Sequence, residues 1–515
     1  MMKNYRRCGA AATVTLFVAI FISAAAAANV FAAEAVRFTV RLDPSVAGSV
    51  PVSGRLLIFM KKDDGKPSDG FGVDDLNPNA VYVSGTELTD LSSDKAIEIN
   101  ADELSFPTAF SAAPAGNYLV FALLDRDHSY TYNGPGTGDI YSPVVKVTMP
   151  STEAAITLNK AVPERKITVP ANARLIEFES PLLSAFWGRP IMMKASVILP
   201  PSYDTARSQK YPTVYDVSGY GGTRLNALRG AAAREKEMKD GKRPEMINVY
   251  LEAQVPMGHS VFADSANNGP WGTALVNEFI PYLEKQFRMD AKPSGRFLTG
   301  HSSGGWTTMW VIVTHPDFFG GTWSTSPDPV DFRNFTGPDI TKMLPQNAFM
   351  DPSGKEYNLV RDGGKELMTF RQYAQQERVL GYYGGQMASF NAVFSPKGDD
   401  GQPMKLFDFD TGRIDPDVQK AWQKYNISKL LTENWKTLGP KLKGKIHIFV
   451  GTADTFHLNE SVKLLDDELK KLGSDARIEY IEGRTHFNLY EGGLAERIAS
   501  EMYAVARPKA KVKSN

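Results

Sequence analysis

The chain has 515 residues, of which 42% are hydrophobic and 23% charged, and its 58 Lys and Arg residues balance 58 Asp and Glu residues. This length exceeds what one hydrophobic core organises, so two or three domains are expected. The balanced charge gives no indication of nucleic acid or another polyanion as a partner.

Residues 1–33 are typical of a cleaved signal peptide. A positive start precedes an apolar stretch and a small-residue site, in the order Lys3, Arg6 and Arg7, Ala10–Ala28, and Val30–Ala32. The alternative is an uncleaved membrane anchor. We expect a periplasmic or secreted protein without stable membrane association after cleavage. The only cysteine, Cys8, lies in this segment, so the mature chain has no thiol nucleophile and no disulfide.

Residues 34–163 are predicted to form an antiparallel β-sandwich. Short alternating runs, separated by turn-forming clusters, lie at 36–40, 55–59, 117–121 and 144–147. The histidine of this region, His128, follows Asp125 and Asp127 in a predicted loop, and no catalytic constellation accompanies it. Carbohydrate binding and shielding of the next domain both remain open as roles.

Residues 164–507 alternate strand-like and helical patterns, which predicts a doubly wound, mostly parallel α/β sheet. The expected strands are 175–180, 192–199, 211–217, 246–251, 295–300, 320–325, 445–450 and 477–481. The expected helices are 224–240, 275–287, 303–313, 459–472 and 490–506. Residues 328–441 interrupt the alternation and are predicted to form a helical lid. Residues 508–515 form a basic tail, expected to be a frayed end.

Gly300-His301-Ser302-Ser303-Gly304 matches the G-x-S-x-G pattern of a nucleophile elbow. The motif lies between a predicted strand and a predicted helix, where a sharp turn requires small neighbours. We therefore expect Ser302 to be a nucleophile; the alternative is a glycine-rich structural turn.

A serine nucleophile needs a base, and the chain has seven histidines. His486 directly follows the last predicted strand, at the sheet edge where ligands of such folds bind, so it is the predicted base. His301 adjoins the nucleophile, and its side chain is expected to point elsewhere. His259 and His457 in loops, with Trp306 in the elbow helix, are the predicted substrate-binding residues.

Asp454 follows the predicted strand 446–450 and is the expected orienting acid, in the chain order Ser, Asp, His. The alternative is that it only caps a turn. Rivals with poorer placement are Asp408, Asp410 and Glu460.

The oxyanion hole is predicted from two backbone N–H groups. One belongs to Ser303, after the nucleophile, and the other to Tyr220 in the glycine-rich turn 217–222. That turn lacks the spacing of a nucleotide-phosphate loop, and no metal-binding motif is found, so no cofactor or metal is expected.

These residues resemble the putative-esterase family, which includes S-formylglutathione hydrolases, feruloyl and other carbohydrate esterases, siderophore esterases and mycolyltransferases. The resemblance covers roughly residues 175–507 apart from the insertion, and rests on the segments 199–204, 211–212, 264–265 with 269–270, 278–284, 300–305, 315–317 and 326–327. It implies an α/β-hydrolase fold with Ser302, Asp454 and His486 as the triad. Many members have His-Gly where this chain has Ser218-Gly219, which bears on the second oxyanion donor.

The predicted function is an exported serine carboxylic-ester hydrolase that acts through an acyl-enzyme on a small-molecule or carbohydrate ester. An acylated carbohydrate and a siderophore ester are the candidate substrates. An acyltransferase on the same triad, a serine peptidase and a non-catalytic binding protein are the alternatives, and the oligomeric state is left open.

Overall fold

The computed structural model describes residues 34–46, 51–151, 153–344, 346–381 and 384–509. The described residues from Ala35 onward form one compact unit. The predicted signal segment 1–33 and most of the predicted tail lie outside the described residues. No helix in the described ranges combines the length and apolar character needed to cross a membrane.

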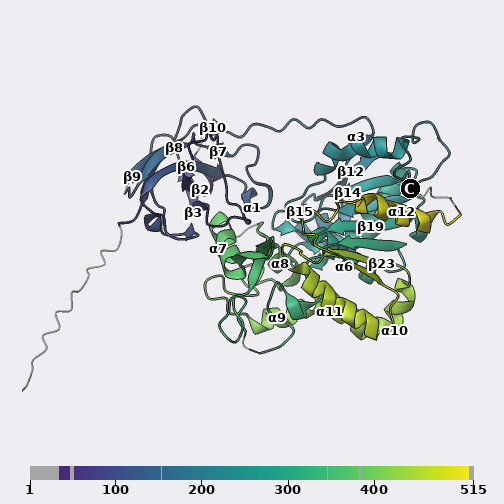
Figure 1. The fold of residues 1–515 in the computed structure, drawn as a ribbon. Coiled ribbons are helices and arrows are strands. Elements are labelled where there is room, and N and C mark those ends of the chain that lie inside the picture. Colours follow the sequence, from purple (N-terminus) through teal and green to yellow (C-terminus); the bar gives the residue numbers. More distant parts are fainter. Residues whose placement is uncertain (1–33, 47–50, 152, 345, 382–383, 510–515) are drawn as a thin grey trace, which may run out of the picture. The chain divides into compact units, whose positions relative to one another are not determined.

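The amino-terminal region contains two β-sheets (Figure 1). Their orders are β4-β1-β9 and β10-β7-β6-β2-β3-β5, with β8 paired to β6. The pairs are antiparallel except for β1 and β9, which run parallel. The strands are β1 (Arg37–Leu42), β2 (Val52–Lys62), β3 (Val81–Leu91), β4 (Ala96–Asn100), β5 (Ser105–Phe106), β6 (Gly116–Asp125), β7 (Ile140–Tyr141), β8 (Val145–Met149), β9 (Glu153–Leu158) and β10 (Lys160–Ala161); helix α1 spans Tyr130–Asn133.

Strand β2 buries side chains on both faces of its sheet. Leu56 and Ile58 belong to the core between the two amino-terminal sheets. The alternate residues Leu57 and Phe59 belong to a second cluster, which continues into the carboxy-terminal region. Successive residues of a strand point to opposite faces, so this unbroken apolar run serves two cores. The β-region is therefore packed against the rest of the described chain.

The carboxy-terminal region is built on an eight-stranded sheet of order β11-β12-β14-β13-β19-β20-β23-β24. From β14 to β24 the neighbours are parallel, whereas β12 is antiparallel to β11 and β14. The strands are β11 (Ala173–Glu179), β12 (Met192–Ile198), β13 (Thr213–Val217), β14 (Ile247–Leu251), β19 (Arg296–His301), β20 (Gly321–Thr325), β23 (Ile446–Gly451) and β24 (Arg477–Ile481). This architecture confirms the predicted α/β class with a preceding antiparallel β-region.

Helices cover both faces of this sheet, as the strand sequences require. Val214 and Phe297 pack in the cluster that includes helix α12 (Leu494–Ala506), whereas the next residues, Tyr215 and Leu298, pack with helix α6 (Ser303–Thr314). The other helices are α2 (Pro181–Trp187), α3 (Asn226–Lys239), α4 (Trp271–Ala274), α5 (Ile280–Gln286) and α11 (Leu458–Lys471), with the π-turn η2 (Leu275–Phe279) and the 3₁₀ turn η3 (Pro293–Gly295). Minor pairs are β15 (Gln254–Val255) with β16 (Gly258–His259), and β17 (Asp264–Ser265) with β18 (Gly269–Pro270).

The predicted insertion has its own secondary structure. It contains the hairpin β21 (Asn358–Asp362) and β22 (Lys365–Thr369), helices α7 (Phe370–Leu380), α8 (Gln386–Phe394), α9 (Pro416–Trp422) and α10 (Ile427–Leu442), and the turns η4 (Phe332–Asn334) and η5 (Gln423–Tyr425). Helix α7 contacts β3 and β5, and α10 contacts α6 and α11. The segment thus joins the amino-terminal sheet to the α/β core.

Candidate active site

Ser302 lies at a sharp turn between β19 and α6. Its backbone has φ 59° and ψ −125°, a conformation that costs energy for a residue with a side chain. The turn brings the helix close to β13, and a Cβ atom on Gly304 would lie 1.9 Å from the Val217 carbonyl oxygen. The small residues of the motif therefore permit the turn, as the sequence pattern requires.

His486 and Asp454 are joined by a hydrogen bond at the carboxyl edge of the sheet. The His486 Nδ1 atom lies 2.9 Å from Asp454 Oδ2, and the two side chains are 5% and 0% exposed. Asp454 Oδ1 also accepts from the N–H groups of Phe456 and Leu458. Burial acts to raise the pKa of Asp454, but the hydrogen bond and charge of His486, together with hydrogen bonds from the Phe456 N–H and Ser326, hold that pKa below its usual value. An ionised carboxylate only accepts, so Nδ1 carries the proton and Nε2 is left as the basic nitrogen.

Asp328 contacts the predicted nucleophile, and the sequence reasoning missed it. It is 3% exposed, and its Oδ1 accepts from the Ser302 hydroxyl at 3.3 Å while its Oδ2 accepts from the Ser303 hydroxyl at 2.6 Å. Burial raises the pKa of Asp328 to about 6. In this structure the nucleophile's hydroxyl is directed at Asp328. One signal could have found it, because Asp328 lies just after β20, at the edge where His486 and Asp454 also lie.

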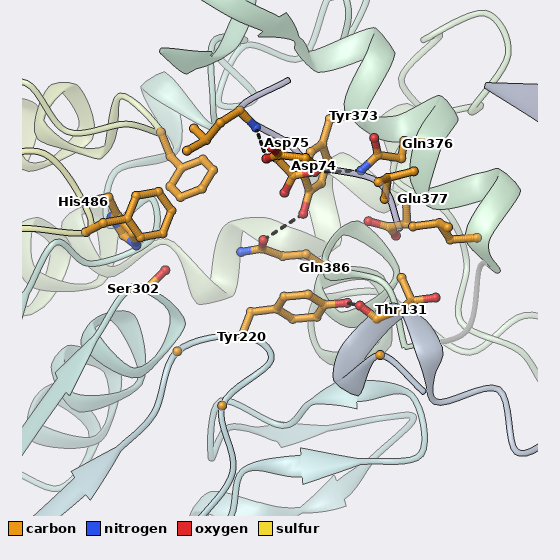
Figure 2. A pocket seen from close by; sticks show the side chains of 18 of the residues that line it. Asp74, Asp75, Thr131, Tyr220, Ser302, Tyr373, Gln376, Glu377, Gln386 and His486 are labelled. Carbon is orange, nitrogen blue, oxygen red and sulfur yellow. Dashed lines mark hydrogen bonds between the residues drawn. The ribbon is translucent and has the colours of Figure 1, made fainter. Parts of the chain in front are cut away.

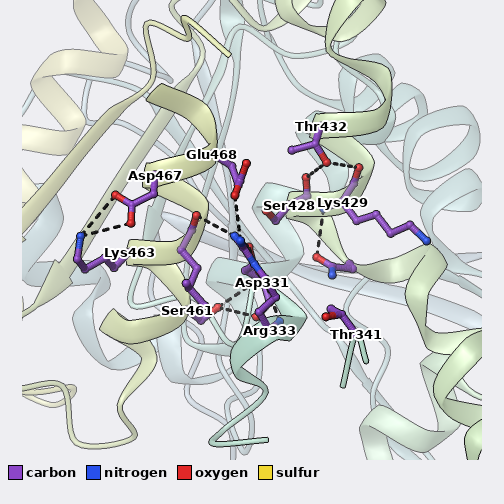
Figure 3. Close-up of polar contacts among 12 residues, drawn as sticks. Asp331, Arg333, Thr341, Ser428, Lys429, Thr432, Ser461, Lys463, Asp467 and Glu468 are labelled. Atoms are coloured by element: carbon purple, nitrogen blue, oxygen red, sulfur yellow. Dashed lines mark hydrogen bonds and ion pairs between the residues drawn. The ribbon is translucent and has the colours of Figure 1, made fainter. Parts of the chain in front are cut away.

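The segment after Asp328 is fastened to α11, which follows Asp454 (Figure 3). The Asp331 N–H donates to Ser461 Oγ at 3.0 Å. Arg333 bonds both carboxylate oxygens of Asp331 and also donates to Glu468 at 2.9 Å. These contacts fix two neighbouring loops at the carboxyl edge of the sheet relative to each other.

The two segments that carry the predicted oxyanion donors lie next to Ser302. Ser303 begins α6, where backbone N–H groups have no partner within the helix. The turn that holds Tyr220 approaches the nucleophile closely, since a Cβ atom on Gly219 would lie 3.0 Å from Ser302 Cβ. The Tyr220 side chain extends away from Ser302, and its hydroxyl lies 2.9 Å from the Thr131 carbonyl oxygen and 2.5 Å from that of Gly384, so its single proton is shared between these two acceptors.

A cavity of about 780 Å³ connects these elements. Figure 2 shows Ser302 and His486 on one side of it and Asp74, Asp75 and Gln376 on the other. The residues that line it come from the β-region, the elbow, the insertion and the loops after β23 and β24: Val73–Leu76, Tyr130, Thr131, Gly134, Gly219, Tyr220, Gly222, His301, Ser302, Tyr373, Gln376, Glu377, Leu380, Gln386, Phe456, His486, Phe487 and Tyr490. Ser302 and His486 thus line one cavity. Asp454 does not line it, but its carboxylate is hydrogen-bonded to His486.

The predicted substrate-binding residues His259 and Trp306 lie outside this cavity. His259 is 1% exposed, its Nε2 lies 2.9 Å from the Ser218 carbonyl oxygen, and its Nδ1 accepts from the Val261 N–H. Burial lowers its pKa to about 4. Trp306 is 2% exposed and packs against Trp310 and Phe394. His259 and Trp306 are therefore core residues and do not line the cavity.

His457 also lies outside the cavity. Its ring lies 3.2 Å from both Glu366 and Glu460, so it joins β22 to α11. Of the rival acids, Glu460 is therefore held by a histidine away from the nucleophile. Asp408 accepts from the backbone of its own turn and Asp410 pairs with Arg378.

His301 lines the cavity, although its side chain was expected to point elsewhere. Its ring centroid lies 4.3 Å from that of His486, and its Nδ1 lies 3.1 Å from Thr325 Oγ1. Burial, reinforced by the charge of His486, lowers the pKa of His301 to about 3. A neutral ring therefore packs against the predicted base.

A cluster of three aspartates that do not line the cavity has the composition of a metal site. Asp125, Asp127 and Asp139 place ligand atoms within 4.8 Å of one another. Backbone N–H groups already donate to all three carboxylates, including those of Tyr130 to Asp125 and Arg126 to Asp139. We assign no ion to this group.

A curated relative, the uncharacterized protein YbbA of Bacillus subtilis (strain 168), is 27% identical over 144 residues, which is 25% of this chain and 55% of that protein. The chain thus spans about half the length of the curated relative it matches.

Solved structures with a similar fold are 15–16% identical to this chain. They include a ferulic acid esterase (65% of this chain and 98% of that one, TM-score 0.43). Two others are the fluorophosphonate-binding serine hydrolase FphF of Staphylococcus aureus (64% and 97%, TM-score 0.38) and an S-formylglutathione hydrolase from Agrobacterium tumefaciens (65% and 95%, TM-score 0.37).

The family described as "Putative esterase" matches residues 190–493, which is more than half of the chain and contains Ser302, Asp454 and His486. This confirms the resemblance inferred from the sequence motifs. The chain belongs to the Putative esterase family.

Proposed function

We propose that the protein is an exported carboxylic-ester hydrolase that uses Ser302 as nucleophile, His486 as base and Asp454 as the acid that orients the base. One observation carries this proposal. The strained elbow serine faces the same cavity as an imidazole whose other nitrogen is held by a buried carboxylate. This is the arrangement that serine acyl transfer needs.

In the proposed reaction the Ser302 hydroxyl turns from Asp328 toward His486 Nε2 and gives up its proton there. The Ser302 oxygen bonds to the acyl carbon, and the carbonyl oxygen becomes an anion. We assign its stabilisation to the N–H groups of Ser303 and Tyr220. The imidazolium then protonates the leaving alcohol as the ester bond breaks. Water, deprotonated by His486, releases the acid from the acyl-enzyme and restores Ser302.

We also propose export, on the basis of the signal-like sequence of residues 1–33. An exported esterase meets extracellular esters, so an acylated carbohydrate or a siderophore ester is the proposed substrate. Amino-terminal sequencing of protein recovered outside the cytoplasm should begin close to Ala33 or Glu34; an intact Met1 there would contradict cleavage.

The Ser302→Ala variant tests the catalytic assignment. Because a triad acts as a unit, the variant should lose several orders of magnitude in kcat on p-nitrophenyl acetate, and a fluorophosphonate probe should no longer label it. Ser208→Ala, at an exposed loop position, is the matched control and should behave as wild type. Near-normal turnover or labelling of Ser302→Ala would refute the assignment.

A further inference from the structure

Part of the cavity wall comes from the amino-terminal β-region. Tyr130 and Thr131 of the short helix α1 line the cavity, together with Val73–Leu76 from the loop between β2 and β3. Figure 2 shows the Tyr220 ring extending from its turn to Thr131. A helix of the β-region therefore contacts the turn that carries the second proposed oxyanion donor.

That turn, residues 219–222, is a β-turn and is called the oxyanion turn below. The Gly222 N–H donates to the Gly219 carbonyl oxygen at 3.0 Å and closes it. Gly221 has φ 77°; such a positive φ at the third position is typical of type II turns, and glycine adopts it without strain. Tyr220 is the second residue, and the turn itself does not use its N–H group. Whether that N–H can serve an oxyanion thus depends on where the turn is held.

Helix α1 and the insertion hold the oxyanion turn through two tyrosines. The Tyr132 hydroxyl donates to the Gly222 carbonyl oxygen at 3.2 Å, and its ring packs edge-on against the Tyr220 ring with the centroids 4.9 Å apart. The Tyr220 hydroxyl lies 2.9 Å from the Thr131 carbonyl oxygen and 2.5 Å from that of Gly384. Tyr132 is 5% exposed, so little water competes for its bond. The turn is tied at two residues to segments outside the α/β core.

Helix α1 is itself fixed to the β-region. Asp125, at the end of β6, is 1% exposed, and its carboxylate accepts from the N–H groups of Ser129 and Tyr130 at 3.2 and 3.0 Å. The Thr131 hydroxyl donates to the Gly381 carbonyl oxygen, after α7, at 3.1 Å. A helix of four residues is not stable by itself, so these bonds are needed to keep Tyr132 in place.

The α/β core fixes only the residue before the oxyanion turn. His259 Nδ1 accepts from the Val261 N–H, so Nε2 carries the proton and donates to the Ser218 carbonyl oxygen at 2.9 Å. Burial lowers the pKa of His259 to about 4, which keeps the ring neutral and preserves this tautomer. Ser218 is thus held by the core, whereas Tyr220 and Gly222 are held by α1 and the insertion.

We propose that α1 of the β-region positions the oxyanion turn, with the Tyr132 and Tyr220 side chains as the positioning groups. This inference rests on the proposed function, because it concerns the anion that forms when Ser302 attacks an ester. An N–H donor stabilises that anion only at hydrogen-bonding distance, so a small displacement of the turn weakens catalysis. The β-region is then a part of the catalytic site and not a separable binding module or shield.

The double variant Tyr132→Phe/Tyr220→Phe, in the full-length protein, tests the proposal. It removes both hydroxyls that tie the oxyanion turn and keeps both rings and every backbone N–H. Acylation and deacylation both pass through an oxyanion, so kcat for p-nitrophenyl acetate should fall about 10- to 100-fold while KM stays within about twofold. This is less than the roughly 10²–10³-fold lost when a donor is deleted, because here the donor is only displaced.

A second measurement separates oxyanion stabilisation from a general effect on the fold. The Ser302 oxygen bonds reversibly to the carbonyl carbon of 1,1,1-trifluoro-2-butanone. The carbonyl π bond opens, His486 takes the hydroxyl proton, and the former carbonyl oxygen becomes an anion. The inhibition constant of this ketone should therefore rise in the double variant by about the factor by which kcat/KM falls.

Tyr118→Phe is the matched control. Tyr118 is a buried tyrosine of β6 whose hydroxyl donates to the Pro114 carbonyl oxygen at 2.8 Å, within the β-region. The control should keep the wild-type kcat and ketone inhibition constant. A wild-type kcat in the double variant would overturn the positioning role. So would a fall in kcat that leaves the ketone's inhibition constant unchanged, or one that Tyr118→Phe reproduces. Turnover retained by Ser302→Ala would refute the proposed function instead, so the two failures are distinguishable.

Discussion

The imidazole Nδ1 of His486 lies 2.9 Å from Oδ2 of Asp454, and both side chains are almost entirely shielded from solvent. In such a pair the carboxylate fixes the tautomer that leaves Nε2 free and stabilises the imidazolium that forms when Ser302 is deprotonated. The link spans two loops, after β23 and after β24, so it depends on the parallel pairing of those strands.

Replacement of Asp454 by Asn should therefore reduce kcat by about 10⁴-fold, since an amide N–H cannot accept from Nδ1 and favours the wrong tautomer. Turnover of p-nitrophenyl acetate at saturating concentration measures the effect. Asp467→Asn, at an exposed site on α11, is the matched control and should retain activity. A loss below tenfold in Asp454→Asn would contradict the orienting role.

The sharp turn at Ser302 leads to a second prediction, which concerns the stability of the folded protein. Gly304→Ala places a Cβ atom 1.9 Å from the Val217 carbonyl oxygen, and neither backbone can retreat without breaking the packing of α6 on the sheet. We expect a loss of about 3 kcal/mol or more in the free energy of unfolding, measured by urea denaturation. Gly230→Ala in α3 meets only the movable end of Arg234, and alanine favours helix, so it should be neutral or stabilising. Equal stability of the two variants would contradict the proposed backbone contact.

The positions of Ser302, Asp454 and His486 could be predicted because each has a local signal: a polar residue in the turn or loop that follows a predicted strand. Parallel strands bring their carboxyl ends to one edge, so such signals converge without knowledge of the tertiary fold. Asp328 carries the same signal after β20, but no motif accompanies it. His259 was selected for its residue type and predicted loop position, and Trp306 for its residue type and place in the elbow helix. Their burial shows that these signals do not separate a pocket wall from a core.

The amino-terminal wall of the cavity could not be predicted in this way. Asp75 and Gln376 are 301 residues apart in sequence, and their hydrogen bond depends on how α7 packs against β3 and β5. The short run at residues 55–59 predicted a strand of the β-region. It did not predict that β2 is buried on both faces, or which segment covers the second face, because apolar packing is not directional.

Asp328 predicts a pH dependence of stability. Its folded pKa is raised from 3.8 to about 6 by burial, so the folded state binds its proton more tightly than the unfolded chain does. The stabilisation from this group is fully present below about pH 4 and is lost as pH rises through about 6, by an amount on the order of 2–3 kcal/mol. Asp328→Asn carries no titratable group and should lack this loss.

Urea unfolding of wild type and Asp328→Asn at pH 4.5 and pH 8 measures the difference. Other buried acids titrate in the same range, but they are present in both proteins and cancel in the comparison. The variant should gain stability relative to wild type as pH rises. A difference between the two proteins that does not change with pH would show that Asp328 has no raised pKa.

The last prediction compares how much two ion pairs contribute to stability: the Asp331–Arg333 pair, which also contacts Glu468, and the Lys463–Asp467 pair on α11 (Figure 3). Asp331 is 1% exposed, and its carboxylate accepts three hydrogen bonds from the Arg333 guanidinium. Lys463 and Asp467, by contrast, form a solvent-exposed pair one turn apart on α11. Arg333→Met leaves a buried carboxylate without its cation and should cost about 2 kcal/mol; this is less than for a fully buried pair because Arg333 is 36% exposed. Lys463→Met removes an equal charge but should cost at most about 0.5 kcal/mol. Urea unfolding at pH 7.5 compares the two variants.

Since Arg333 also fastens the loop after Asp328 to α11, Arg333→Met should lower kcat as well, and Lys463→Met should not. Equal costs for the two variants would show that burial of Asp331 does not set the strength of its pair.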